Sequence, residues 1–297
     1  MLQDSNRPLA NMTFVVGLLA GSFAAAAASQ IQPAEQGQPA ATSRPAEAAP
    51  RSSGDPAVDA LLDRLEAKGN SIKGLSAEIV YTHITTEPVV DRQKKIGRLL
   101  FARGNPNDRF LVHFTKLLAD GVVSTTAEYY AFDGQWYVER NDAGKNVLRR
   151  ELGRRGERID AFELGKGPFP LPFGQKRSDI LWHFEVSIAA DTKDLPKGLT
   201  HLICTPRAHS SLAEEYSRVE MWIDTRLDLP VRIATERSVD KVRVEVEFNQ
   251  IDLKDAPAGS RFTVETPKGF FETVEPFDDR PPIDVTPRGK LPGGEKP

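Results

Sequence analysis

Two-residue alternation of apolar and polar side chains runs through most of this 297-residue chain and constrains its fold more than any other feature. In the clearest stretch, Val242, Val244, Val246 and Phe248 alternate with polar residues. Every second side chain of a β-strand lies on the same face, so the pattern predicts strands with one apolar and one polar face. Such strands are predicted at residues 75–86, 95–102, 109–115, 122–132, 135–140, 147–152, 180–188, 199–205, 217–224, 231–237 and 241–249, with a last short strand at 261–266.

The connections between these segments are short and favour antiparallel hairpins. Asp133-Gly134 separates two alternating runs, and residues 142–145 form the next turn. Asp-Gly between alternating runs is among the better hairpin signals. A sheet of about eleven antiparallel strands with a single apolar face must curl, stack or close to cover that face.

One helix is predicted before the strands, at residues 55–68. Asp55 is a suitable N-cap, Leu61, Leu62 and Leu65 recur at helical spacing, and Gly69 is placed to end the helix. The apolar stripe of this helix predicts that it lies on the sheet.

The second covering element is the central stretch 155–174, a short helical pattern followed by a loop rich in Gly and Pro. Such a loop cannot form a regular strand, but it can lay Phe169, Leu171 and Phe173 against an apolar surface as a lid. The predicted fold class is therefore mainly β with a small α content. It is a curved antiparallel sheet or incomplete β-barrel of about eleven strands, covered by an N-terminal helix and a central helix-loop lid. The alternative is that helix and loop fill the core and leave no cavity.

The termini are predicted to lie outside this domain. Residues 1–28 resemble a secretory signal peptide, with Arg7 before an uncharged apolar run that ends in small residues; the alternative is a membrane anchor. Residues 29–54, rich in Ala, Pro, Gln and Ser, are expected to form a disordered linker. The domain is then expected at 55–277 and a disordered tail at 278–297.

Charge and motif content argue against several functional classes. The net charge of −3 favours no nucleic acid partner. The single cysteine, Cys204, lies in an apolar run and is expected to be a buried hydrophobic residue. The sequence contains no H-x-x-x-H metal pair, G-x-S-x-G elbow or phosphate-binding loop. We therefore expect no cofactor, no metal and no enzymatic activity.

Several motifs, taken in their order, resemble the LolA-type periplasmic carriers of outer-membrane lipoproteins. They are Gly-Arg-Leu-Leu-Phe-Ala-Arg at 97–103, the Asp-Gly hairpin with Trp at 130–138, the Met-Trp-Ile-Asp to Leu-Pro hairpin at 221–230, and Phe-Thr-Val-Glu-Thr-Pro-Lys-Gly at 262–269. The resemblance implies an incomplete β-barrel over an apolar cavity, in a monomer located in the periplasm. It implies as partners an acylated lipoprotein or lipid, an inner-membrane release complex and an outer-membrane receptor.

Alternation and this resemblance together predict the site. Arg103 matches by position the basic residue that regulates lid closure in such carriers, although here Gly104 and Asn105 separate it from the following Pro106. The predicted lipid-binding cavity residues are Leu99, Phe101, Phe110, Val112, Phe114, Phe169, Leu171 and Phe173.

The carrier is not the only function compatible with this sequence. A LolA-like domain can also serve as a sensor of mislocalised lipoproteins, and the same fold with a filled core would be a structural module of the envelope. A lipid-modifying enzyme is the alternative with the least support.

Overall fold

The computed structural model describes residues 52–85, 90–159, 175–190, 195–253 and 257–277 of the chain. Its helical elements are α1 (Pro56–Ser71), α2 (Arg177–His183), α3 (Leu212–Glu215) and the 3₁₀ turn η1 (Gly259–Phe262). The strands are β1 (Gly74–Thr85), β2 (Asp91–Ala102), β3 (Arg109–Ala119), β4 (Val122–Phe132), β5 (Trp136–Asn141), β6 (Asn146–Glu151), β7 (Phe184–Ile188), β8 (Leu199–Pro206), β9 (Tyr216–Asp224), β10 (Leu229–Arg237), β11 (Arg243–Asp252) and β12 (Phe271–Glu275).

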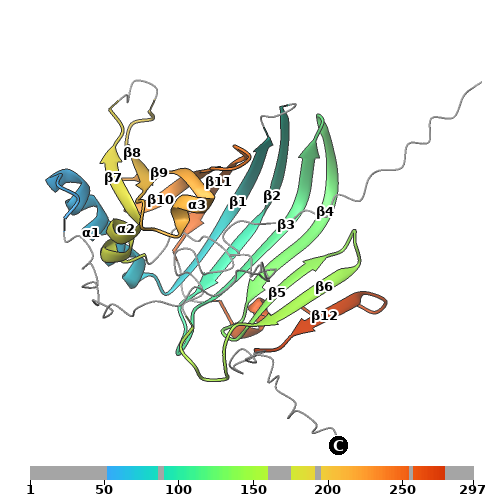
Figure 1. Cartoon of the computed structure of the whole chain (residues 1–297). Helices are drawn as coiled ribbons and strands as arrows, with labels where there is room; N and C mark the ends of the chain where they lie inside the picture. The colour runs from blue at the N-terminus through green and yellow to red at the C-terminus, as the bar shows by residue number, and fades with distance from the viewer. Residues whose placement is uncertain (1–51, 86–89, 160–174, 191–194, 254–256, 278–297) are drawn as a thin grey trace, which may run out of the picture.

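These strands form a single 12-stranded sheet in the order β12-β6-β5-β4-β3-β2-β1-β11-β10-β9-β8-β7. The sheet is strongly curved but does not close, and β12 and β7 are its two edges (Figure 1). The predicted fold class, a mainly β incomplete barrel with few helices, is confirmed. The sheet is not wholly antiparallel, however, because β12 runs parallel to β6.

Two irregularities in the ladder accompany the curvature. The register between β2 and β3 shifts at Gly97, and the register between β3 and β4 shifts between Phe114 and Lys116. Extra residues of this kind bend a strand and increase its twist. Gly97 is required at its position, because a Cβ there would lie 2.1 Å from the carbonyl oxygen of His113.

Helix α1 begins as predicted and ends later. The Asp55 carboxylate accepts a hydrogen bond from the backbone N–H of Ala57 at 2.8 Å, which is the expected N-cap. The prediction that Gly69 ends the helix was wrong, since α1 continues to Ser71. The carbonyl of Gly69 instead accepts hydrogen bonds from Ile72 and Arg103, so tertiary contacts support this last turn.

Two predicted strands differ from the structure, one in part and one completely. Residues 180–183 of the predicted strand 180–188 belong to α2, and β7 begins at Phe184. Ile180 and Leu181 are both buried, which a helix on an apolar surface allows and a half-exposed strand does not.

The predicted last strand at 261–266 is also wrong, because η1 and a non-strand segment occupy these positions. Phe262 and Val264 are buried against the face of β2–β6 opposite to the main core. Alternation suits any extended segment that lies on an apolar surface, so the pattern alone could not separate this from a strand. As a consequence, the face of β2–β6 opposite the main core is also partly shielded from water.

The packing of Phe262 can be tested against an exposed phenylalanine. Phe262 is 1% exposed, whereas Phe271 on β12 is 74% exposed. We expect Phe262→Ala to lower the free energy of unfolding by about 3–5 kcal/mol, since it leaves a cavity. The control Phe271→Ala should change it by less than about 0.5 kcal/mol. Urea unfolding followed by tryptophan fluorescence measures both, and similar losses in the two variants would contradict the described cover.

Candidate functional site

Five of the predicted cavity residues meet on one face of the sheet. Cross-strand pairs join Phe101 to Phe110 and Leu99 to Val112, and Phe114 lies opposite Gly97. Leu99, Phe101, Phe110, Val112 and Phe114 are all at most 2% exposed. Phe169, Leu171 and Phe173, the predicted lid residues, lie outside the described residues.

These five residues belong to a larger apolar cluster, called here the inner cluster. Its rings form a connected set, in which Phe110 lies 6.4 Å from Phe132 and 6.5 Å from Tyr137 between ring centroids. Sequence reasoning did not assign its members on β1 and β11 to the site, because the β1–β11 pairing joins distant parts of the chain. The inner cluster consists of Ile72, Leu75, Ala77, Ile79, Tyr81, Leu99, Phe101, Phe110, Val112, Phe114, Tyr130, Phe132, Tyr137, Leu229, Val242, Val244, Val246 and Phe248.

The helices cover the sheet unequally. Val58, Leu61 and Leu62 of α1 and Ile180 and Leu181 of α2 pack in a second cluster with β7, β8 and β9. The inner cluster, in contrast, has no buried member from a helix among the residues that the structure describes. Among the described residues, helices therefore cover the half of the sheet formed by β7, β8 and β9. They contribute no buried side chain to the cluster on the half that carries the five predicted residues.

Asn107 fastens the first residues of the predicted lid, which begins at residue 155. Its side-chain amide donates to the carbonyls of Gly134 and Glu157 at 2.6 and 2.8 Å, and its oxygen accepts from the N–H of Ile159 at 2.7 Å. Ile159 itself packs against the inner cluster. A nearly buried amide with three partners holds this point of the chain on the apolar face.

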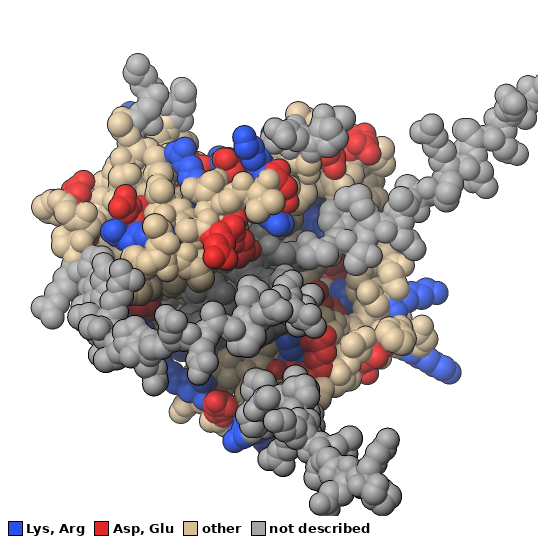
Figure 2. All heavy atoms as spheres, in the orientation of Figure 1, with Lys and Arg blue, Asp and Glu red and all other residues tan. Residues whose placement is uncertain are grey.

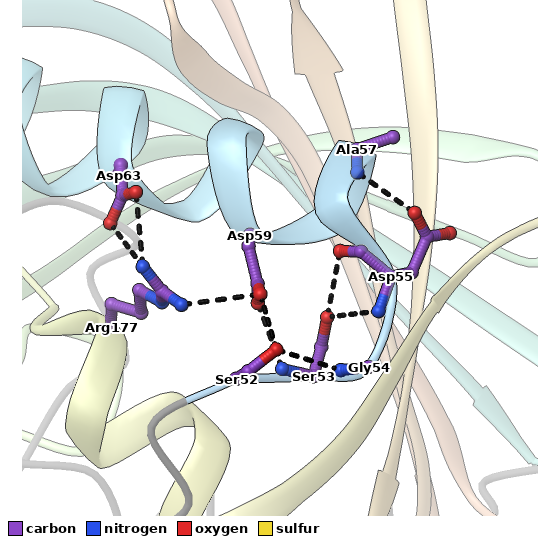
Figure 3. A network of polar contacts seen from close by, with 8 residues as sticks. All are labelled: Ser52, Ser53, Gly54, Asp55, Ala57, Asp59, Asp63 and Arg177. Carbon is purple, nitrogen blue, oxygen red and sulfur yellow. Dashed lines mark hydrogen bonds and ion pairs between the residues drawn. The ribbon is translucent and has the colours of Figure 1, made fainter.

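Arg177 fastens the chain just after the predicted lid. Its guanidinium lies against the acidic side of α1, with Asp63 at 2.8 Å and Asp59 at 3.3 Å (Figure 3). Its backbone N–H donates to Glu66 at 2.8 Å. The start of α2 is thereby tied to α1, and the acidic residues of the helix have a structural partner.

Arg103 connects the end of α1 to the turn between β2 and β3. Its guanidinium donates to the carbonyls of Gly69 at 2.5 Å and Ile72 at 3.3 Å, and it forms an ion pair with Asp108 at 2.6 Å. A cation at a helix C-terminus satisfies carbonyls that the helix leaves unpaired. Arg103 thus positions α1 relative to the sheet.

A polar group interrupts the apolar face near the middle of β2. Lys95 Nζ lies 2.6 Å from Glu128 Oε2, and the Tyr130 hydroxyl donates to the same carboxylate at 3.1 Å. Burial, reinforced by the Glu128 charge, raises the pKa of Tyr81 to about 12 and holds the pKa of Tyr130 far above its ordinary value. Both phenols therefore remain protonated at neutral pH.

Other chemistry is sparse in the part of the chain that the structure describes. There, no group of three or more His, Cys, Asp or Glu side chains could hold a metal ion. Cys204 is buried as predicted, and burial raises the pKa of its thiol to about 12. Lysines and arginines are interspersed with acidic residues on the face shown in Figure 2. Within the described ranges no helix is both long and apolar enough to cross a membrane.

Comparisons with known proteins identify similar folds. No family model and no curated protein matches the chain. An uncharacterised conserved protein from Thermus thermophilus has a similar solved structure, with 11% identity over 74% of this chain and 99% of the other, and a TM-score of 0.45. A LolA superfamily protein from Nitrosomonas europaea matches 69% of this chain and 96% of its own at 12% identity and TM-score 0.31.

A third similar structure is the MucA/MucB complex of Pseudomonas aeruginosa. It matches 69% of this chain at 10% identity with a TM-score of 0.37, and the match spans only 60% of the other chain. A LolA superfamily protein is thus among the solved structures to which this fold is similar.

The attachment of α1 to Arg177 should weaken in acid. Hydrogen bonds from Ser52 and Ser53, together with Arg177, hold the pKa of Asp59 at about 2, below its ordinary 3.8. A depressed carboxylate pKa contributes stability above the unfolded-state pKa, and this contribution is lost as pH falls through the folded-state pKa. Asp59→Asn should therefore make stability less dependent on pH between 3.8 and 2. Urea midpoints across this range measure the effect, and equal slopes for both proteins would contradict it.

Proposed function

We propose that this protein is a periplasmic carrier that takes up the acyl chains of a lipoprotein or lipid and passes them to an outer-membrane acceptor. The observation that supports this best is the inner cluster, a large apolar face on one half of an unclosed sheet. Among the described residues, no helical side chain belongs to this cluster. Hydrocarbon is the ligand class that such a face can bind.

The energy available from this face suits a reversible carrier. Burying a methylene group contributes about 0.8 kcal/mol, so about ten methylenes supply roughly 8 kcal/mol before other costs. That free energy corresponds to a dissociation constant of about 1 μM. Partial enclosure of one acyl chain is therefore sufficient for binding that a membrane acceptor can compete for.

In this proposal the central segment is the lid. Asn107 and Arg177 support the idea, because Asn107 holds the segment near its start, at Ile159, and Arg177 holds the chain just after it, at the start of α2. Phe169, Leu171 and Phe173 would then face the acyl chain, and a ligand would enter by displacing the segment between two fixed points. Arg103 would gate entry indirectly, through its hold on the end of α1.

Phe110→Asp tests the binding face. A buried unpaired carboxylate is unfavourable in contact with hydrocarbon, so we expect loss of bound acyl lipid with some loss of stability. Phe271→Asp, which changes an exposed phenylalanine in the same way, should retain binding. Native mass spectrometry of protein purified from the envelope, and fluorescence binding of a labelled fatty acyl probe, provide the measurements. Equal occupancy in both variants would remove the inner cluster from the site.

Arg103→Leu tests gating. Three interactions with α1 and Asp108 are lost, yet the apolar face is intact, so the variant should fold and bind lipid but transfer it poorly. Arg64→Leu, on the exposed side of α1, removes one ion pair with Asp228 and should transfer normally. Transfer of labelled lipoprotein from inner to outer membrane vesicles is the readout. Normal transfer by Arg103→Leu excludes this residue from the mechanism, and binding without any transfer in the unmodified protein favours a sensor.

A further inference from the structure

The ion pair of Lys95 and Glu128 is unusual among those that the described residues form. The side chains are 8% and 9% exposed, and no other described pair has both partners below 10%. Glu128 also accepts hydrogen bonds from the hydroxyls of Tyr130, at 3.1 Å, and Thr126, at 3.3 Å. The pair therefore has a nearly dry and partly preorganised environment.

This group lies on the same face as the inner cluster. Lys95 pairs across strands with Tyr81 and Leu117, and Glu128 lies opposite Phe114. Tyr81 and Tyr130 each form an edge-to-face contact with Phe114, with 6.1 Å between centroids, so their rings connect the ion pair to the apolar residues. The face thus has a charged group among its apolar residues, with Leu99 and Phe101 on one side of it along the strands and Val244 on the other.

Stability does not explain the pair. Removing two charges from water costs several kcal/mol for each ion, and well-packed apolar side chains of similar volume are often equally or more stable. The pair has no net charge. Lys95 could release Glu128 and bind an anionic group of a ligand, and Glu128 could in the same way bind a cationic group. A ligand that carries both a negative and a positive group would leave Lys95 and Glu128 each paired with an opposite charge.

We propose that Lys95 and Glu128 form a head-group site for a zwitterionic phospholipid, with Lys95 on the phosphate and Glu128 on the ammonium group. The proposal rests on the carrier function above and specifies its ligand. A net anionic head group would leave Glu128 buried without a cation, and a lipid without a charged head would gain nothing from opening the pair.

The dimensions of the face are consistent with this orientation. Lys95 and Phe101 are six residues apart on β2, which at about 3.3 Å per residue places them roughly 20 Å apart. One leaflet contributes about half of the 30 Å hydrocarbon thickness of a bilayer. An acyl chain of about 15 Å that starts at the ion pair therefore covers the face as far as Leu99 and its partner Val112, and it ends about 5 Å short of Phe101.

Head-group preference of the delipidated full chain tests the proposal. Phosphatidylethanolamine, phosphatidylglycerol and diacylglycerol with identical acyl chains compete against a labelled acyl probe, and phosphoethanolamine without chains serves as a further competitor. We expect the ethanolamine lipid to bind at least about tenfold better than the other two, and the chain-free head group not to compete, because most of the affinity comes from the acyl chains.

Two variants and a control make the test specific. Lys95→Met/Glu128→Leu should lose the preference but retain diacylglycerol binding. Glu128→Gln should reverse the preference toward phosphatidylglycerol, since it leaves one positive charge. The control Arg150→Met/Glu275→Gln removes an ion pair of equal length, 2.6 Å, that is largely exposed, and should keep the original preference.

The outcomes separate this proposal from the carrier function. If acyl lipids bind but the unmodified protein shows no preference, or if Glu128→Gln keeps the original one, the head-group site is wrong and the carrier function stands. If none of the lipids binds to the unmodified protein, both proposals are wrong.

Discussion

The pairing of β1 with β11 is the interaction on which the rest of the structure depends. Without it the chain would consist of two separate meanders, β1–β6 and β7–β11, each with an apolar face too small to cover itself. Eight residue pairs from Ser76–Asp252 to Ile84–Arg243 join them into one sheet. Closing such a long loop costs only slightly more entropy than closing a shorter one, because the cost grows with the logarithm of loop length. The apolar residues of both meanders are thereby brought onto one face.

Unequal cover of that face follows from the order of elements. Helix α1 precedes β1 but packs with β7, β8 and β9, so it lies over the second meander. The inner cluster belongs mainly to the first meander and to β11. Arg103 and Arg177 fix α1 at its two ends, to the β2–β3 turn and to α2 respectively. Both ends of the helix are therefore tied to neighbouring elements.

Charged side chains lie in two different environments in this protein. Around α1 they stay partly exposed and hold elements together, as Arg177 does with Asp59 and Asp63 (Figure 3). Lys95 and Glu128 instead lie inside, next to Tyr81 and Tyr130, and the Tyr130 hydroxyl donates a hydrogen bond to Glu128. This face therefore combines an ion pair with apolar side chains.

Local pattern by itself located β1–β11 but not β12, because a strand repeats every two residues whatever its neighbours are. It also located the N-cap of α1 and the face to which Leu99, Phe101, Phe110, Val112 and Phe114 belong. It failed where alternation has a second explanation, as at Phe262 and Val264, which cover the sheet without pairing in it. It also failed at Ile180 and Leu181, a short apolar run that fits a helix or a strand. Only the tertiary structure decided that β1 pairs with β11, that Asn107 holds Ile159, and that Lys95 meets Glu128. These contacts join residues far apart in the chain, and their energies depend on burial that no local pattern encodes.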